Sequence, residues 1–229
     1  MKIHPIAWLA GFLPLLTIHL CYGVAAALDH IPTCIPYIHS CTSISSAGRE
    51  VPEFYLFKLL MIPSAIVIMG FWTLASGWLR GINKTRKYLP KLVLMFGLIA
   101  CLGLIVYSLA LGRIGPEYRL QRRIGVIIFF ALTFVSQYLF FVGLTSSAEL
   151  RQKNLVLIKM LGLVLLGVVL FAVSAVIISA VNTGFYDRLE DAFEWWVTAL
   201  QCIYVLIVAR IWQQTSAMHS TESNLYRVK

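Results

Sequence analysis

Charged residues are scarce in this chain of 229 residues, and long stretches contain none of them. Lys, Arg, Asp and Glu together make up 13% of the sequence, whereas hydrophobic residues make up 59%. A soluble domain of this length would expose many more charged side chains, so the composition excludes an ordinary soluble globular protein. The uncharged stretches are 3–28, 59–79, 92–112, 124–148, 160–186 and 195–209.

These stretches have the length and character of membrane spans. A helix needs roughly 20 apolar residues to cross the hydrocarbon core, and the first five stretches reach that length. The sixth does so if the long side chain of Arg210 reaches the interface. The alternation typical of barrel strands is missing, so the sequence predicts an all-α, polytopic membrane protein, a six-transmembrane-helix bundle. The expected spans are about 6–28, 54–79, 91–112, 123–146, 155–181 and 191–213, followed by a flexible cytoplasmic tail over 214–229.

The distribution of charge predicts the orientation of the bundle. If the N-terminus is cytoplasmic, most basic residues fall in the cytoplasmic segments 80–91 and 151–159 and near the C-terminus, and most acids fall on the other side. Positive residues gather on the cytoplasmic side of membrane proteins, so both termini are expected in the cytoplasm. The net charge of +9 therefore indicates membrane topology and not a nucleic-acid partner. The first apolar run, about 25 residues long, exceeds the core of a cleavable signal peptide and is expected to remain as a span.

The sequence also lacks the common signatures of catalysis and of coupled transport. It contains no Gly-x-Ser-x-Gly elbow, phosphate-binding glycine loop or His-Glu-x-x-His motif, and nothing indicates a cofactor. The most polar residues expected inside the membrane are His19, Ser136, Gln137 and Gln201. Only His19 could titrate, whereas ion-coupled transporters usually place ionisable groups at mid-membrane. A transporter is therefore the least favoured class.

Cys34 and Cys41 lie in the first outer loop, about 29–54, which is the longest loop expected. In an oxidising compartment a disulfide between them would stabilise the loop by roughly 2–3 kcal/mol. Zinc binding by His30, Cys34, His39 and Cys41 is an alternative, but their spacing matches no common closed zinc site. Free thiols are a third alternative. The disulfide is favoured, and no metal is predicted.

The first and second outer loops are rich in groups that bind lipid phosphates. Hydroxyls can donate to ester or sugar oxygens, arginine binds phosphate, and glycine permits close approach. For the first loop, the alternative is a structured turn that leads into the second span. The residues predicted to bind a lipid head group are Ser43, Ser45, Ser46, Gly48, Arg49, Arg119, Arg122 and Arg123.

The arginines of the second outer loop, 113–123, have a second possible partner. Acids of the first and third outer loops could form ion pairs with them, and this pairing is the simpler interpretation. The third loop supplies Asp187, Glu190, Asp191 and Glu194.

The segment 43–58 resembles the region before the second span in the FRAG/DRAM/SFK family of six-span proteins. Its Ile-Ser-x-x-Gly-x-x-x-Pro-Glu spacing is like that of one branch, and its Ser-Ser-Ala and Gly-x-Glu-Val-Pro runs are closer to the Golgi branch that remodels GPI-anchor lipids after attachment. The pair Glu194-Trp195 resembles the acidic-aromatic start of the family's last span. Several members have a histidine where this chain has Arg122-Arg123, so no role is carried over to that position.

The resemblance implies an integral membrane protein that interacts with lipids at the non-cytoplasmic leaflet and supports lipid remodelling or acyl transfer to a lysolipid. The lipid partner would be a phospholipid, lysolipid or glycolipid, in a bacterial inner membrane or, in a eukaryote, the Golgi or another endomembrane. If the protein is an enzyme, His39 and Glu50 are the candidate catalytic acid and base. The alternative is a non-enzymatic adaptor or regulator of a partner membrane protein.

Overall fold

The structure is a computed structural model that describes residues 3–82 and 86–227, with side chains described as far as Ser216. Every regular element in these residues is a helix. Six helices are long and apolar enough to cross a membrane, which confirms the predicted all-α, six-span bundle. They are α1 (His4–Ala27), α4 (Glu53–Ile82), α5 (Leu89–Ala110), α6 (Pro116–Thr145), α8 (Leu155–Val181) and α10 (Glu190–Arg227).

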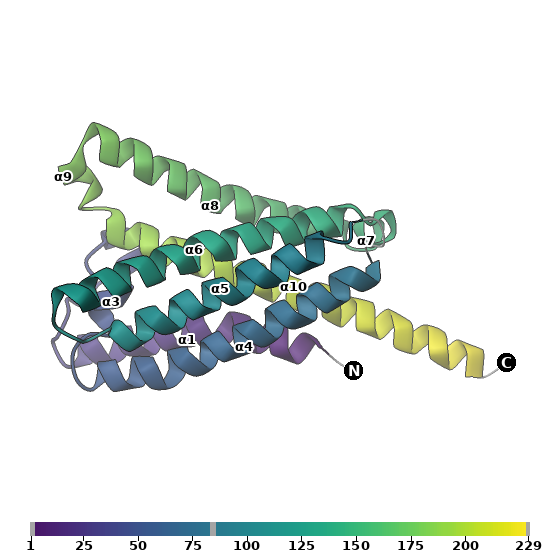
Figure 1. Cartoon of the computed structure of the whole chain (residues 1–229), viewed down its shortest axis with the longest axis horizontal. Coiled ribbons are helices and arrows are strands. Elements are labelled where there is room, and N and C mark those ends of the chain that lie inside the picture. The colour runs from purple at the N-terminus through teal and green to yellow at the C-terminus, as the bar shows by residue number, and fades with distance from the viewer. Residues whose placement is uncertain (1–2, 83–85, 228–229) are drawn as a thin grey trace.

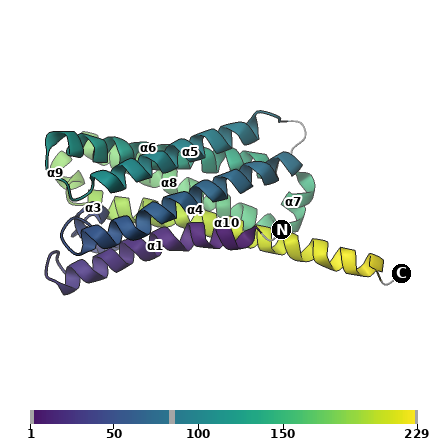
Figure 2. The ribbon, with the colours of Figure 1, turned by 60° about the horizontal axis from the view of Figure 1, so that its bottom comes forward.

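Four short helices lie in the connections between the long ones. α2 (Pro36–His39), α3 (Ile44–Ala47) and α9 (Thr183–Tyr186) lie at one end of the bundle, which we call the loop end (Figure 1). α7 (Ala148–Lys153) lies at the opposite end, toward which both chain termini are directed (Figure 2). The longest connection, between α1 and α4, therefore packs on the loop end.

Two long helices have bounds that differ from those expected. α6 begins at Pro116, earlier than the expected start near 123, and α10 continues to Arg227, past the expected end near 213. Proline suits the first position of a helix, and the preceding Gly115 has a φ of 138°, a conformation that favours glycine. Arg119, Arg122 and Arg123, which were predicted to lie in the second outer loop, therefore lie on the first turns of α6.

α5 and α6 pack closely because two glycines face each other. A Cβ atom on Gly103 would lie 2.9 Å from the backbone oxygen of Gly125, and one on Gly125 would lie 2.7 Å from the oxygen of Gly103. Small residues allow membrane helices to approach in this way. The contact fixes α6 against α5 near the loop end.

α8 is the most peripheral of the spanning helices. It meets α6 near α7 and diverges from it toward the loop end (Figure 1). In its most apolar stretch of 18 residues only 17% are buried, whereas 56% are buried in the corresponding stretch of α10. The divergence leaves the sides of α6 and α10 accessible near the loop end, where the candidate site lies.

Candidate functional site

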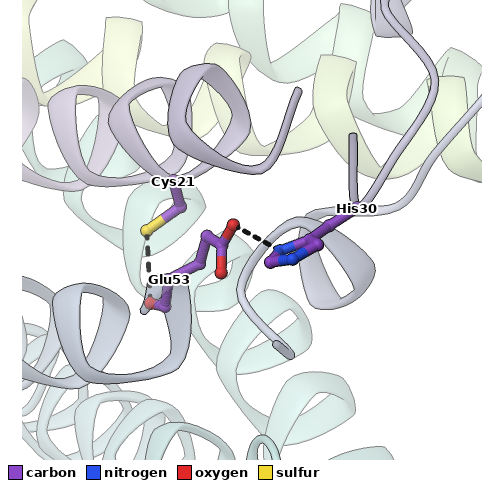
Figure 3. Close-up of polar contacts among 3 residues, drawn as sticks. All are labelled: Cys21, His30 and Glu53. Atoms are coloured by element: carbon purple, nitrogen blue, oxygen red, sulfur yellow. Dashed lines mark hydrogen bonds and ion pairs between the residues drawn. The ribbon is translucent and has the colours of Figure 1, made fainter. Parts of the chain in front are cut away.

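The start of the α1–α4 connection is held by a buried acid. Glu53, the first residue of α4, has a side chain that is 0% exposed, and its Oε1 lies 2.8 Å from Nδ1 of His30 (Figure 3). The thiol of Cys21 on α1 lies 3.9 Å from the Glu53 carbonyl oxygen. No role for Glu53 was predicted from the sequence, and its place in the Pro-Glu spacing was the one signal that could have marked it.

His19 on α1 also contacts this connection. Its Nε2 lies 3.1 Å from the hydroxyl oxygen of Tyr37, and its Nδ1 lies 2.7 Å from the carbonyl oxygen of Leu15. Burial, followed by the influence of Cys202, raises the pKa of Tyr37, which keeps its hydroxyl protonated. His19 therefore links α1 to the loop through a hydrogen bond with Tyr37.

The two loop cysteines are paired. Cys34 and Cys41 form a disulfide, with Cα atoms 6.7 Å apart. His39 has a different partner: its Nδ1 accepts a hydrogen bond of 3.1 Å from the N–H of Ile35. In the described ranges, no three or more His, Cys, Asp and Glu side chains lie together as a possible metal site.

The first turns of α10 hold the second half of the loop. The indole N–H of Trp195 donates to the carbonyl oxygen of Thr42 at 2.9 Å, and the N–H of Ile44 donates to Oε2 of Glu194 at 3.2 Å. Glu194 and Trp195 thus both contact the first outer loop through hydrogen bonds. Both side chains fix the loop segment that contains α3.

Three serine hydroxyls cluster on this fixed segment. Ser43 caps α3, and its Oγ accepts a hydrogen bond of 3.0 Å from the N–H of Ser46. The same Oγ lies 3.0 Å from Oγ of Ser45 and 2.9 Å from Oγ of Ser46. The cap orients all three hydroxyls together at the edge of an open groove.

The groove lies between α6, α8 and α10 at the loop end, and its volume is about 800 Å³. We call its polar edge the rim and its apolar part the wall. The rim is formed by Ser43, Ser45, Ser46, Arg49, Arg123, Tyr186, Glu190, Asp191 and Glu194. The wall is formed by Val126, Ile127, Phe130, Phe171, Ala172, Ala175, Phe193 and Val197.

The rim combines cations, acids and hydroxyls from three separate parts of the sequence. Burial and the neighbouring carboxylates of Glu190 and Asp187 raise the pKa of Tyr186, so its phenol is an uncharged donor at the rim. Among the side chains that the structure describes, as far as Ser216, no arginine lies within 4.0 Å of a carboxylate. The expected ion pairs of the second-loop arginines are therefore wrong, and Arg123 lines the groove together with the acids Glu190, Asp191 and Glu194.

Several residues predicted for the site lie outside the groove. Arg122 donates to the carbonyl oxygens of Ala110 at 3.1 Å and Arg113 at 2.8 Å, where it satisfies the end of α5. Gly48 is buried against the ring of Phe57, where a Cβ atom would lie 2.7 Å from a ring carbon. The remaining predicted residues that do not line the groove are His39, Glu50, Arg119 and Asp187.

The wall was not predicted, because no charge or motif marks it. Its residues are ordinary apolar residues of α6, α8 and α10, and only the divergence of α8 distinguishes them from core. A polar rim joined to an apolar wall has the two-part chemistry of a membrane lipid. The groove can therefore accommodate a head group and part of a chain.

One family matches almost the whole chain. The family described as Frag1/DRAM/Sfk1/Cwh43P N-terminal domain matches residues 3–210, which include all six spans as far as the middle of α10. No curated protein and no solved structure matches the chain.

Proposed function

Since the chain belongs to the Frag1/DRAM/Sfk1/Cwh43P family of membrane proteins, we propose that it binds a membrane lipid in the groove, with the head group at the rim. The observation that carries the proposal is the joining of charged and hydroxyl groups to an apolar wall in one groove of about 800 Å³. Lipid chains would lie along the wall between α6 and α8.

The charges of the rim favour a zwitterionic head group. Arg49 and Arg123 can bind a phosphate, and Glu190 and Asp191 can bind an ammonium group. A purely anionic head group would meet these two acids, and an uncharged one would leave both arginines without a partner. Phosphoethanolamine satisfies both sets of charges.

The loop end is proposed to face the non-cytoplasmic side. Seven basic residues lie at the opposite end of the bundle, namely Arg80, Arg86, Lys87, Lys91, Arg151, Lys153 and Lys159. The positive-inside tendency supports this orientation, which leaves both termini in the cytoplasm. The bound lipid would then belong to the outer or lumenal leaflet.

Remodelling of the bound lipid, or acyl transfer to a lysolipid, is the use that we propose for the site. The resemblance of the segment 43–58 to the GPI-remodelling branch supports this use. His39 and Glu50 do not line the groove. The groove residues are therefore proposed to bind the lipid, and none of them is proposed to be catalytic.

The experiment is lipid retention measured by native mass spectrometry on the full chain in nanodiscs. The probes are lysophosphatidylethanolamine, lysophosphatidylglycerol and monoacylglycerol with identical chains. We expect the zwitterionic lipid to be retained best, and Arg123→Ala to weaken its retention about tenfold, as the loss of a charge-assisted hydrogen bond predicts. Arg119→Ala, on the same helix but outside the groove, is the matched control.

Two outcomes would overturn the proposal. One is equal retention of the three lipids by the wild-type protein. The other is an equal effect of Arg123→Ala and Arg119→Ala. A protein that retains no lipid but co-purifies with one membrane protein at a fixed ratio would favour the adaptor alternative.

A further inference from the structure

A small cavity inside the bundle adjoins the groove. Val126, Phe130 and Glu194 line both spaces, and further lining residues of the cavity come from α1, α4 and α5. On α10 the lining extends from Glu194 to Val205, which corresponds to about 16 Å along the helix at 1.5 Å per residue. The cavity therefore leads from the groove into the interior of the bundle.

The surface that the cavity presents to an occupant is almost entirely apolar. Its lining includes Ile18, Met61, Ile68 and Leu104. Several other lining residues are polar, but their side-chain nitrogen and oxygen atoms that lack a hydrogen-bond partner are covered by neighbouring protein atoms. Water would find few hydrogen-bonding partners in such a space, and cavities of this chemistry bind apolar groups.

The entrance from the groove lies between α6 and α10, beside Val126 and Glu194. α6 packs mainly along α5 and contacts α10 much less. Farther from the loop end, the side-chain amide of Gln137 donates to the carbonyl oxygen of Gln201 at 2.9 Å. The hydroxyl of Tyr204 donates to the carbonyl oxygen of Gln137 at 2.7 Å. These hydrogen bonds fasten α6 to α10 beyond the entrance.

The volume and the length of the cavity suit an unbranched hydrocarbon chain. The volume is about 60 Å³. At roughly 10–15 Å³ for each water-sized group, it accommodates about four to six carbon atoms. A volume this small that extends so far along α10 is too narrow for a ring system such as that of a sterol. The cavity therefore suits the end of a chain and not a whole lipid.

We infer that the lipid in the groove inserts the end of an acyl chain into this cavity. Val126 and Phe130 belong to the wall, so a chain that follows the wall reaches the entrance without leaving an apolar surface. Inside the cavity, its last carbon atoms gain close contacts with the lining residues. This inference rests on the proposed function, because the chain belongs to the lipid whose head group occupies the rim.

The test uses two photoreactive lysophosphatidylethanolamines of the same chain length with the full chain in nanodiscs. One probe has a diazirine next to the ester, and the other has it at the end of the acyl chain. Mass spectrometry of the cross-linked peptides locates the label. We expect the chain-end probe to label Met61, Ile68 and Leu104, which line the cavity but not the groove. Each is at most 6% exposed, so lipid around the bundle does not reach them.

Two variants reduce the space inside the cavity. Thr133→Leu and Cys202→Leu each place a larger side chain at a position that lines it. Label on the three interior residues should fall at least about fivefold, the ratio for the smallest usual cost of overpacking, and label in the groove should remain. Ala131→Leu, at an exposed position of α6 outside the cavity, is the matched control and should keep the interior label. Melting in detergent identifies the folded variants, and one of the two is enough.

The two probes separate failure of this inference from failure of the proposed function. If the probe with the diazirine next to the ester labels the groove but the chain-end probe does not label the interior residues, the inference is overturned and the groove proposal stands. Interior label that is equally strong in a folded Thr133→Leu or Cys202→Leu variant also overturns the inference. If neither probe labels the groove or the interior above exposed positions of the bundle, both proposals fail.

Discussion

Arg122 and Arg123 are adjacent in the sequence, but they have different partners in the structure. Arg122 donates to two carbonyl oxygens near the end of α5, whereas Arg123 lines the groove between α6, α8 and α10. One arginine therefore stabilises the α5–α6 connection, and the other is available to a ligand.

This difference predicts opposite effects of two alanine substitutions. Arg122→Ala should lower the free energy of unfolding by about 1–3 kcal/mol, because two backbone carbonyls lose a charged donor. Arg123→Ala should change stability little and should weaken lipid retention. Thermal unfolding in detergent, alongside lipid retention in nanodiscs, measures both effects. Equal stability losses in the two variants would refute the assignment.

The glycine contact between α5 and α6 should be intolerant of a methyl group. Gly125→Ala places a Cβ atom 2.7 Å from the Gly103 oxygen, and overpacking of this kind costs about 1–3 kcal/mol. Gly23→Ala is the control, since no atom lies within 4 Å of the added Cβ. The melting temperature should fall only for Gly125→Ala, and similar values for both variants would contradict the close approach.

The His30–Glu53 pair should contribute more to stability than the other loop histidine. His30→Ala leaves the buried Oε1 of Glu53 without its donor, which should cost about 1–3 kcal/mol. His39→Ala, at an exposed position, should have a smaller effect. Unfolding in detergent compares the two variants, and a larger loss for His39→Ala would show that the pair does not hold the loop.

The disulfide predicts the number of thiols that react. Cys21, Cys101 and Cys202 are free in the structure, so maleimide should label three cysteines in the denatured, unreduced protein and all five after reduction. Replacing Cys34 and Cys41 by serine should lower stability by about 2 kcal/mol, given the short loop between them. Labelling of five cysteines without reduction would contradict the pairing.

The fold could be predicted from the sequence because hydrophobic length alone decides it. Charge-free stretches of the required length can cross a bilayer only as helices, and the structure has six such helices. The start of α6 could not be placed in the same way. Arg119, Arg122 and Arg123 have the composition of a loop, and only the Gly115-Pro116 sequence indicates an earlier helix start.

Residues of the rim could be predicted from the sequence, whereas those of the wall could not. Ser43, Arg49, Arg123 and Glu194 were recognised as unusual polar residues, but in three separate loops. Which of them meet depends on how α6, α8 and α10 pack, and helices that are apolar on all sides carry no stripe that shows which face is buried.

Photo-crosslinking of a lysophosphatidylethanolamine with a diazirine in its chain is the most direct test of the lipid groove. In nanodiscs, with cross-linked peptides identified by mass spectrometry, the label should concentrate on Phe130, Phe171 and Ala175 of the wall, and Arg123→Ala should reduce it. Equal labelling of exposed positions elsewhere, such as Leu59 and Leu163, would show that the probe reports only general contact with the bilayer and would contradict a lipid site in the groove.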